Sequence, residues 1–66
     1  MKLFVNGASV EYGEPLTITT LLAQYKLKPE TVVVEYNRRV PGKHEYDQIT
    51  LAEGDQIEIV KFMGGG

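Results

Sequence analysis

The sequence contains no cysteine and only one histidine, His44. Without cysteine the chain can form no disulfide, no thiolate metal site and no thiol nucleophile. His44 lies in a Gly-Lys-His-Glu stretch with no second ligand nearby. An isolated histidine lacks the partners that metal binding or a catalytic triad requires. We therefore predict that His44 is a solvated surface residue and that the chain holds no metal.

Long apolar runs and basic runs are also missing. No apolar stretch approaches the about 20 residues that a membrane-spanning helix needs. The sequence has seven basic and nine acidic residues, which gives a net charge of −2, and Arg38 and Arg39 are the only adjacent basic pair. Because a nucleic-acid-binding domain needs a basic stripe to neutralise phosphates, we expect neither a nucleic-acid nor a membrane partner. A small domain with neither disulfides nor a signal peptide fits the cytoplasm better than secretion.

The length of the chain limits its architecture. With 66 residues it is near the lower size at which a domain folds unaided, so we expect one domain with one small core. Such a core leaves no room for a cofactor cavity. We therefore predict that the chain binds no cofactor of its own.

The N-terminal segment predicts a β-hairpin. Leu3-Phe4-Val5 is β-prone, and the Asn6-Gly7 that follows is a strong signal for a type I′ turn, because both residues tolerate a positive φ. We predict paired strands at about 2–6 and 8–12. Since side chains alternate along a strand, Leu3 and Val5 should face the core and Phe4 the opposite side.

A helical pattern of apolar residues follows the hairpin. Its members, spaced i, i+3, i+4 and i+7, are Ile18, Leu21, Leu22 and Tyr25. Thr17 is a suitable N-cap, and Pro29 prevents a continuation of the helix. We predict a helix at about 18–26, with Tyr25 in the core or at its boundary. A helix this short is stable only when packed on the rest of the fold.

The second half of the chain predicts mainly extended structure. A β-branched strand at about 31–36 is followed by a turn at Asn37-Arg38 and a short return strand at 39–40. Residues 43–48 predict a surface loop from which Tyr46 packs back onto the core. The last strand is expected at 56–62.

The last strand carries apolar side chains on both faces. Ile57 and Ile59 share one face, which we assign to the helix side, so Val60 and Phe62 face outward. With Phe4 on the neighbouring strand, and with Met63 extending the surface, these residues predict an apolar patch that docks a partner. The alternative is that they are scattered surface apolar residues, which are common.

The sequence ends in Gly64, Gly65 and Gly66. A glycine run is entropically costly to order and has no side chain to bury, so stability does not explain it. We predict a globular part at 1–62 and a flexible tail at 63–66 that presents the α-carboxylate of Gly66 to a narrow cleft in a partner. Five residues from Phe62 onward reach roughly 16–18 Å when extended. The alternative is an ordinary frayed terminus.

Two further segments complete the pattern. Residues 34–41 read Val-Glu-Tyr-Asn-Arg-Arg-Val-Pro, and residues 53–59 read Glu-Gly-Asp-Gln-Ile-Glu-Ile. Together with the order of elements and the final Gly65-Gly66, they resemble the ThiS family, the sulfur carriers of thiamine biosynthesis. The resemblance covers the whole chain. It implies an α+β, ubiquitin-like β-grasp fold: a mixed sheet whose first and last strands are parallel central neighbours, with one helix across one face.

The resemblance also implies a carrier function rather than an enzymatic one. In that function an E1-like adenylating enzyme uses ATP to adenylate the C-terminal carboxylate of Gly66. A persulfide sulfur donor then converts the adenylate to a thiocarboxylate, and thiazole synthase receives the sulfur. The reference pKa of an α-carboxyl group is about 3.3–3.7, so this nucleophile is ionised at neutral pH.

Several alternatives remain open from the sequence. Glu53, Asp55 and Glu58 are expected to be turn and surface charges, with a role in meeting basic residues of the adenylating enzyme as a further hypothesis. The small subunit of molybdopterin synthase shares the fold and the Gly-Gly end. A ubiquitin-like interaction module with disordered glycines, and a modifier conjugated to lysines through Gly66, are the other two possibilities.

Overall fold

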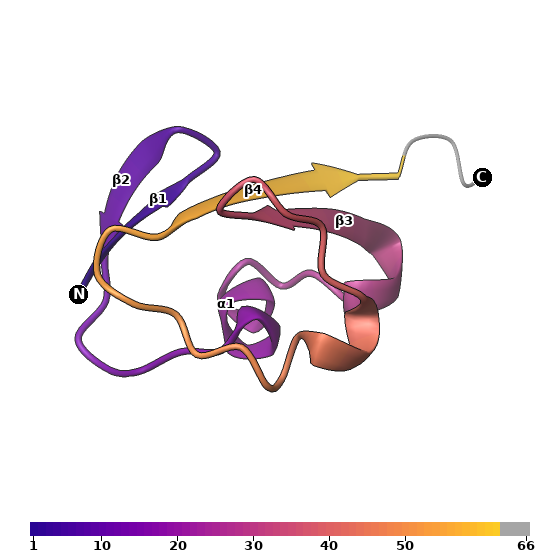
Figure 1. Cartoon of the computed structure of the whole chain (residues 1–66), viewed down its shortest axis with the longest axis horizontal. Helices are drawn as coiled ribbons and strands as arrows, with labels where there is room; N and C mark the ends of the chain where they lie inside the picture. Colours follow the sequence, from indigo (N-terminus) through magenta and orange to yellow (C-terminus); the bar gives the residue numbers. More distant parts are fainter. Residues whose placement is uncertain (63–66) are drawn as a thin grey trace.

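The computed structural model describes residues 1–62, and the predictions for Met63, Gly64, Gly65 and Gly66 lie outside the described residues. A four-stranded sheet carries one α-helix on one face (Figure 1). The elements in chain order are β1 (Lys2–Val5), β2 (Ala8–Glu11), α1 (Ile18–Gln24), η1 (Pro29–Thr31), β3 (Val32–Tyr36), η2 (Lys43–Glu45) and β4 (Gln56–Lys61), η1 and η2 being short 3₁₀ helices. None of the helices within residues 1–62 is long and apolar enough to span a membrane.

The strand order in the sheet is β2-β1-β4-β3. β4 is parallel to β1, with Val5 beside Ile57, and antiparallel to β3, with Val34 beside Ile59. The first and last strands are thus adjacent and central, which confirms the predicted β-grasp arrangement. β4 runs from the side of the molecule near the N-terminus toward the side where η1 and η2 lie (Figure 1).

The β1–β2 hairpin forms as predicted, with each strand one residue shorter than expected. Asn6 and Gly7 have φ angles of 51° and 82°, the backbone that a type I′ turn requires. The register pairs Leu3 with Val10 and Val5 with Ala8. Leu3 and Val5 both face the core and are buried there, as predicted.

α1 begins at its predicted N-cap and ends earlier than predicted. The backbone N–H of Thr20 donates to Thr17 Oγ1 at 3.2 Å, and that of Thr17 donates to Thr20 Oγ1 at 2.7 Å. At the other end Lys26 adopts a left-handed φ of 59°. Its N–H bonds to the Ala23 carbonyl, and the next N–H, that of Leu27, bonds to the Leu22 carbonyl. This pair of bonds is a Schellman motif, so the helix stops at Gln24 rather than at 26.

The core lies between α1 and the inner face of the sheet. Its buried members are Leu3, Val5, Leu16, Ile18, Leu21, Leu22, Val32, Val34, Tyr46, Leu51 and Ile57. Tyr46 packs back from its loop with 2% of its surface exposed, as predicted. Tyr25 is 40% exposed and lies at the boundary of the core.

The predicted return strand at 39–40 is wrong. Asn37 and Arg38 both have positive φ and form a tight turn, after which Arg39 makes a single β-bridge with Tyr36. Pro41 has no N–H to continue a ladder, and Val40 is 68% exposed. The Lys43 ammonium donates to the Val32 carbonyl at 3.1 Å. The free edge of β3 is therefore covered at both of its ends.

Candidate functional site

The start of β4 is held by hydrogen bonds on both sides. The N–H groups of Phe4 and Asn6 donate to the carbonyls of Asp55 and Ile57 at 2.9 and 2.8 Å. On the β3 side, the Gln56 N–H donates to Asn37 Oδ1 at 2.9 Å. These hydrogen bonds fix the direction in which β4 runs across the sheet.

The carboxylate of Asp55 organises the turn before β4. It accepts hydrogen bonds from the Tyr36 hydroxyl at 2.9 Å, from Asn37 Nδ2 at 3.1 Å and from the Ala52 N–H at 2.8 Å. Burial first, and the hydrogen bond to Asp55 second, raise the pKa of Tyr36. The Asp55 carboxylate therefore contributes to the fold.

The end of β4 has a neighbour on one side only. The last bond toward the hairpin is made by a side chain, because the Ile59 N–H donates to Asn6 Oδ1 at 2.7 Å. On the other side the ladder continues to the Phe62 N–H, which donates to the Thr31 carbonyl at 3.1 Å. β4 ends at Lys61, and the glycines at 64–66, whose predicted role lies outside the described residues, follow it in the sequence.

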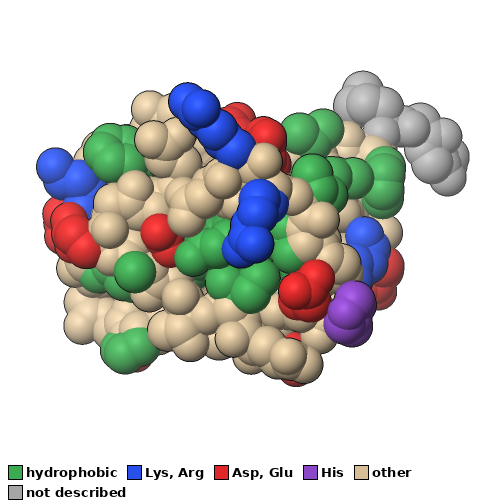
Figure 2. All heavy atoms as spheres, viewed as in Figure 1, with side chains coloured by type: hydrophobic (Ala, Val, Ile, Leu, Met, Phe, Trp, Pro, Cys, Tyr) green, Lys and Arg blue, Asp and Glu red, His purple; other side chains and the backbone are tan. Residues whose placement is uncertain are grey.

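The outer face of β4 carries the predicted apolar residues. Val60 and Phe62 are 61% and 58% exposed, and Val60 lies opposite Val33 of β3. The Lys43 ammonium stands 5.6 Å from the centroid of the Phe62 ring, within the range of a cation–π contact. Hydrophobic side chains gather at the end of the molecule at which β4 finishes (Figure 2).

Phe4 lies on this outer face but not next to the other two. The parallel register places it beside Gln56, four residues before Val60, which is roughly 13 Å along a strand. Between them stands Glu58, directly opposite Glu35 of β3. The apolar surface beside the end of β4 is therefore made by Val33, Val60 and Phe62, and it is narrower than the sequence predicted. Its docking role stays a prediction.

The acidic residues singled out from the sequence have different environments. Glu53 accepts a hydrogen bond from the Lys2 N–H at 2.9 Å, so Glu53 and Asp55 both serve the turn before β4. Glu58 is exposed on the outer face. His44 is exposed in η2, as predicted. Within residues 1–62, no group of three or more histidine and carboxylate side chains is placed to hold a metal ion.

Sequence reasoning missed a cluster of lysines. The basic residues look scattered along the chain, yet Lys26 and Lys28, which follow α1, and Lys61, which ends β4, line one groove. A groove of about 330 Å³ beside the end of β4 is lined by Lys26, Leu27, Lys28, Thr31, Lys61 and Phe62. No periodicity within one element signals this cluster, because its members come from separate elements.

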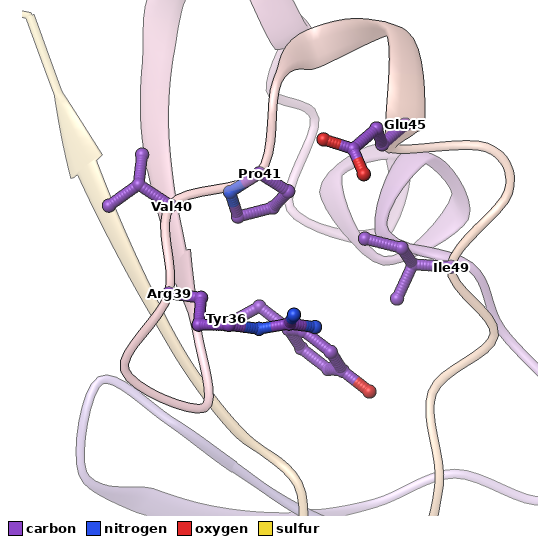
Figure 3. Close-up of a pocket in the computed structure, with 6 residues that line it drawn as sticks. All are labelled: Tyr36, Arg39, Val40, Pro41, Glu45 and Ile49. Atoms are coloured by element: carbon purple, nitrogen blue, oxygen red, sulfur yellow. The ribbon is translucent and has the colours of Figure 1, made fainter.

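A smaller hollow of about 170 Å³ lies at the other end of β3. Tyr36 and Arg39 extend into it from the β3 turn, Pro41 borders it, and Glu45 and Ile49 form the opposite wall (Figure 3). Glu45 Oε2 accepts a hydrogen bond from the Gly42 N–H at 2.9 Å. This carboxylate thus supports the loop that frames the hollow.

Comparison with known proteins gives a consistent result. The model of the ThiS family matches residues 3–66. The sulfur carrier protein ThiS of Bacillus subtilis (strain 168) is 43% identical over 65 residues, which cover 97% of this chain and 98% of that protein. The crystal structure of the thiamine biosynthesis protein (ThiS) from Geobacter metallireducens superposes with a TM-score of 0.84 at 39% identity and covers 100% of both chains.

A second kind of relative is much longer. A thiazole synthase of Paramagnetospirillum magneticum is 36% identical over 66 residues, which are 100% of this chain and only 20% of that protein. A thiazole synthase of Magnetococcus marinus shows the same relation at 39% identity. A region similar to the whole chain thus occurs within larger proteins as well as alone.

Proposed function

Because the chain belongs to the ThiS family, it is a sulfur carrier protein of thiamine biosynthesis and not an enzyme, and we propose that it carries the sulfur on the C-terminal carbon of Gly66. The observation that carries this proposal is the family match, which extends over the glycines at 64–66. The fold supports it, because the central strand β4 is the last element before them in the sequence.

The proposed chemistry begins with activation of the α-carboxylate. A carboxylate oxygen of Gly66 attacks the α-phosphorus of an ATP bound by an E1-like adenylating enzyme, and pyrophosphate leaves. The resulting acyl-adenylate has an electrophilic carbonyl carbon, because AMP is a good leaving group. ATP is bound by the partner, and the chain itself binds no cofactor in this scheme.

Sulfur then replaces AMP. The terminal sulfur of a persulfide on a donor protein attacks the carbonyl carbon, AMP leaves, and an acyl disulfide forms. A thiol attacks the donor-side sulfur of that bond, which releases the thiocarboxylate on Gly66 and leaves a new disulfide. The thiocarboxylate passes its sulfur to a thiazole synthase, a recipient supported by the similarity between this chain and part of two such synthases.

We assign partner docking to the outer face beside the end of β4. Val33, Val60 and Phe62 form an exposed apolar surface next to the strand end that leads to the tail, and exposed apolar patches mark interaction sites. Phe4 and Met63 were predicted to belong to the same surface. The register makes Phe4 a peripheral member, and Met63 lies outside the described residues.

The relatives favour this function over a molybdopterin-synthase subunit, because their names refer to thiamine biosynthesis or thiazole synthase. Conjugation to lysines uses the same activated carboxylate and needs a separate test.

The intact mass of the protein purified from its native host tests the proposal. We expect a species heavier than the unmodified chain by the difference between a sulfur and an oxygen atom, localised by fragmentation to Gly66. A variant lacking both Gly65 and Gly66, expressed in the same host, is the matched control and should show only the unmodified mass. If the wild-type chain also shows no such species during active thiamine synthesis, the carrier chemistry is wrong.

A further inference from the structure

A groove beside the end of β4 and the hollow that adjoins it combine positive charge with open backbone groups, and we infer that together they bind an extended acidic segment of the adenylating enzyme. The inference rests on the proposed function, since it names a docking element of that same partner. The groove has a volume of about 330 Å³, and the lysines that line it are Lys26, Lys28 and Lys61. An adjoining hollow of about 310 Å³ shares Leu27 and Lys61 and continues past the end of β1 to Asn6.

The three lysines are available for a partner. Within residues 1–62 the one salt bridge joins the N-terminal amine to Glu11 at 3.7 Å, far along the chain from these lysines. All three lysines are exposed, and Glu30, the acidic residue of η1, does not line the groove. A cluster of positive charge on a chain with a net charge of −2 is a local feature that attracts carboxylates.

The backbone of β4 adds a second observation. The N–H groups of Val60 and Phe62 point toward β3, as the Phe62 bond to Thr31 shows. Because these groups alternate along a strand, the N–H and C=O groups of Ile59 and Lys61 point away from β3. The Ile59 N–H donates a hydrogen bond to Asn6 Oδ1 on that side. β1 pairs with β4 only up to Ile57. The Ile59 carbonyl and the Lys61 N–H therefore face the hollow and have no strand beside them within residues 1–62.

These features together select a polypeptide. An extended segment supplies main-chain groups for the Ile59 carbonyl and the Lys61 N–H, as in strand addition to a sheet edge. Its carboxylates meet the lysine ammonium groups, and an apolar side chain between them packs on the half-buried Leu27. A free phosphate satisfies the lysines but uses neither the backbone groups nor the apolar floor.

The domain organisation of two relatives favours the adenylating enzyme as the source of this segment. In two relatives a region like this chain lies within the thiazole synthase itself. In those proteins the carrier-like region and the synthase are one molecule, so their encounter does not depend on diffusion between separate molecules. The adenylating enzyme is proposed to meet the carrier as a separate protein. Complementary charge mainly accelerates such an encounter.

The test compares two double substitutions that change the net charge equally. Lys28→Gln with Lys61→Gln empties the groove of two charges, and Arg38→Gln with Arg39→Gln removes two charges near the start of β4. Each takes the net charge from −2 to −4. The two sites are separated by the length of β4, roughly 16 Å. The association rate with the adenylating enzyme of the source organism is measured by stopped flow across a range of salt concentrations.

We expect the lysine variant to associate at least about fivefold more slowly at low salt, with the difference closing near 1 M salt, where the Debye length is about 3 Å. The arginine variant should lose less than about twofold. Equal losses for both variants, or no loss for either, overturn the inference. If the wild-type chain supports no ATP–pyrophosphate exchange with the adenylating enzyme, the proposed function fails. The exchange assay therefore distinguishes a failure of the proposed function from a failure of the inference about the groove.

Hydrogen exchange in the wild-type complex tests the backbone part. The Lys61 amide should become protected when the adenylating enzyme binds, while the Ser9 amide on the far edge strand β2 remains unchanged. Unprotected exchange at Lys61 in the saturated complex contradicts the paired segment.

Discussion

At its start β4 lies between two hydrogen-bonded strands, whereas at its end only β3 remains beside it. The start is further tied down by the carboxylate of Asp55, with three donors, and by the side chain of Asn37. The end presents exposed apolar residues on one face and a lysine-lined groove on the other. The comparison indicates that one half of a single strand supports the fold and the other half is open to partners.

The largest expected effect concerns the chain end itself. Gly66→Trp should abolish adenylation, because a bulky side chain blocks the narrow cleft that the proposal requires. The free energy of unfolding should stay within about 0.5 kcal/mol of the wild type, as for surface substitutions in general. ATP–pyrophosphate exchange and urea denaturation measure the two quantities. If this variant showed the ATP–pyrophosphate exchange rate of the wild type, the carboxylate of Gly66 would not be the group that is adenylated.

The next effect concerns the start of β4. Asp55→Ala leaves the Tyr36 hydroxyl, the Asn37 amide and the Ala52 N–H without their acceptor. Because hydrogen bonds to a charged group contribute about 1.5–3 kcal/mol each and are not additive, we expect a loss of about 2–4 kcal/mol in the free energy of unfolding. Glu58→Gln is the matched control, since Glu58 is an exposed carboxylate in the strand that follows this turn. A similar loss in both variants would refute the contrast between the two ends.

The outer face at the end of β4 should show the reverse behaviour. Val60→Asp with Phe62→Ala should weaken binding of the adenylating enzyme about tenfold, which corresponds to about 1.4 kcal/mol. Stability should change little, because both side chains are mainly exposed. Phe4→Ala, at the other end of the same face, should weaken binding less. Isothermal titration calorimetry measures these affinities. An equal effect of Phe4→Ala would support the wider docking patch that the sequence predicted.

The smallest expected effect is a pH dependence at the start of β4. The pKa of Tyr36 is raised by burial and then by Asp55, so above the unfolded value of about 10 the native state holds a proton that the unfolded state has released. Stability is therefore fully present below pH 10 and falls as the pH rises through the native pKa. Denaturation at several alkaline pH values should show this fall in the wild type. The slope should be smaller in Tyr36→Phe, and an identical slope would exclude Tyr36 as its source.

Local signals predicted most of the fold. Asn6-Gly7 specified the hairpin turn, Thr17 the start of α1, and Ile57 the buried face of β4. The end of α1 was placed too late because Lys26 adopts a left-handed conformation that is typical of glycine. The return strand at 39–40 was wrong because Pro41 ends the pairing after one bridge.

The site depended more on long-range register. Which residue of β1 lies beside which residue of β4 is not encoded in either segment, so the separation of Phe4 from Val60 was not predicted. The lysine groove was missed for the same reason, because Lys28 and Lys61 are brought together only by the packing of α1 on the sheet. The role of Gly66 came from the family resemblance and stays a prediction.

The covered edge of β3 has a consequence for the behaviour of the protein at high concentration. An exposed sheet edge next to apolar side chains is a template for aggregation. Here the Lys43 ammonium occupies the Val32 carbonyl and Arg39 pairs with Tyr36, so the free edge of β3 offers little backbone for another copy to extend. The exposed apolar surface of Val33, Val60 and Phe62 therefore does not lie beside an open β3 edge along which fibres could form.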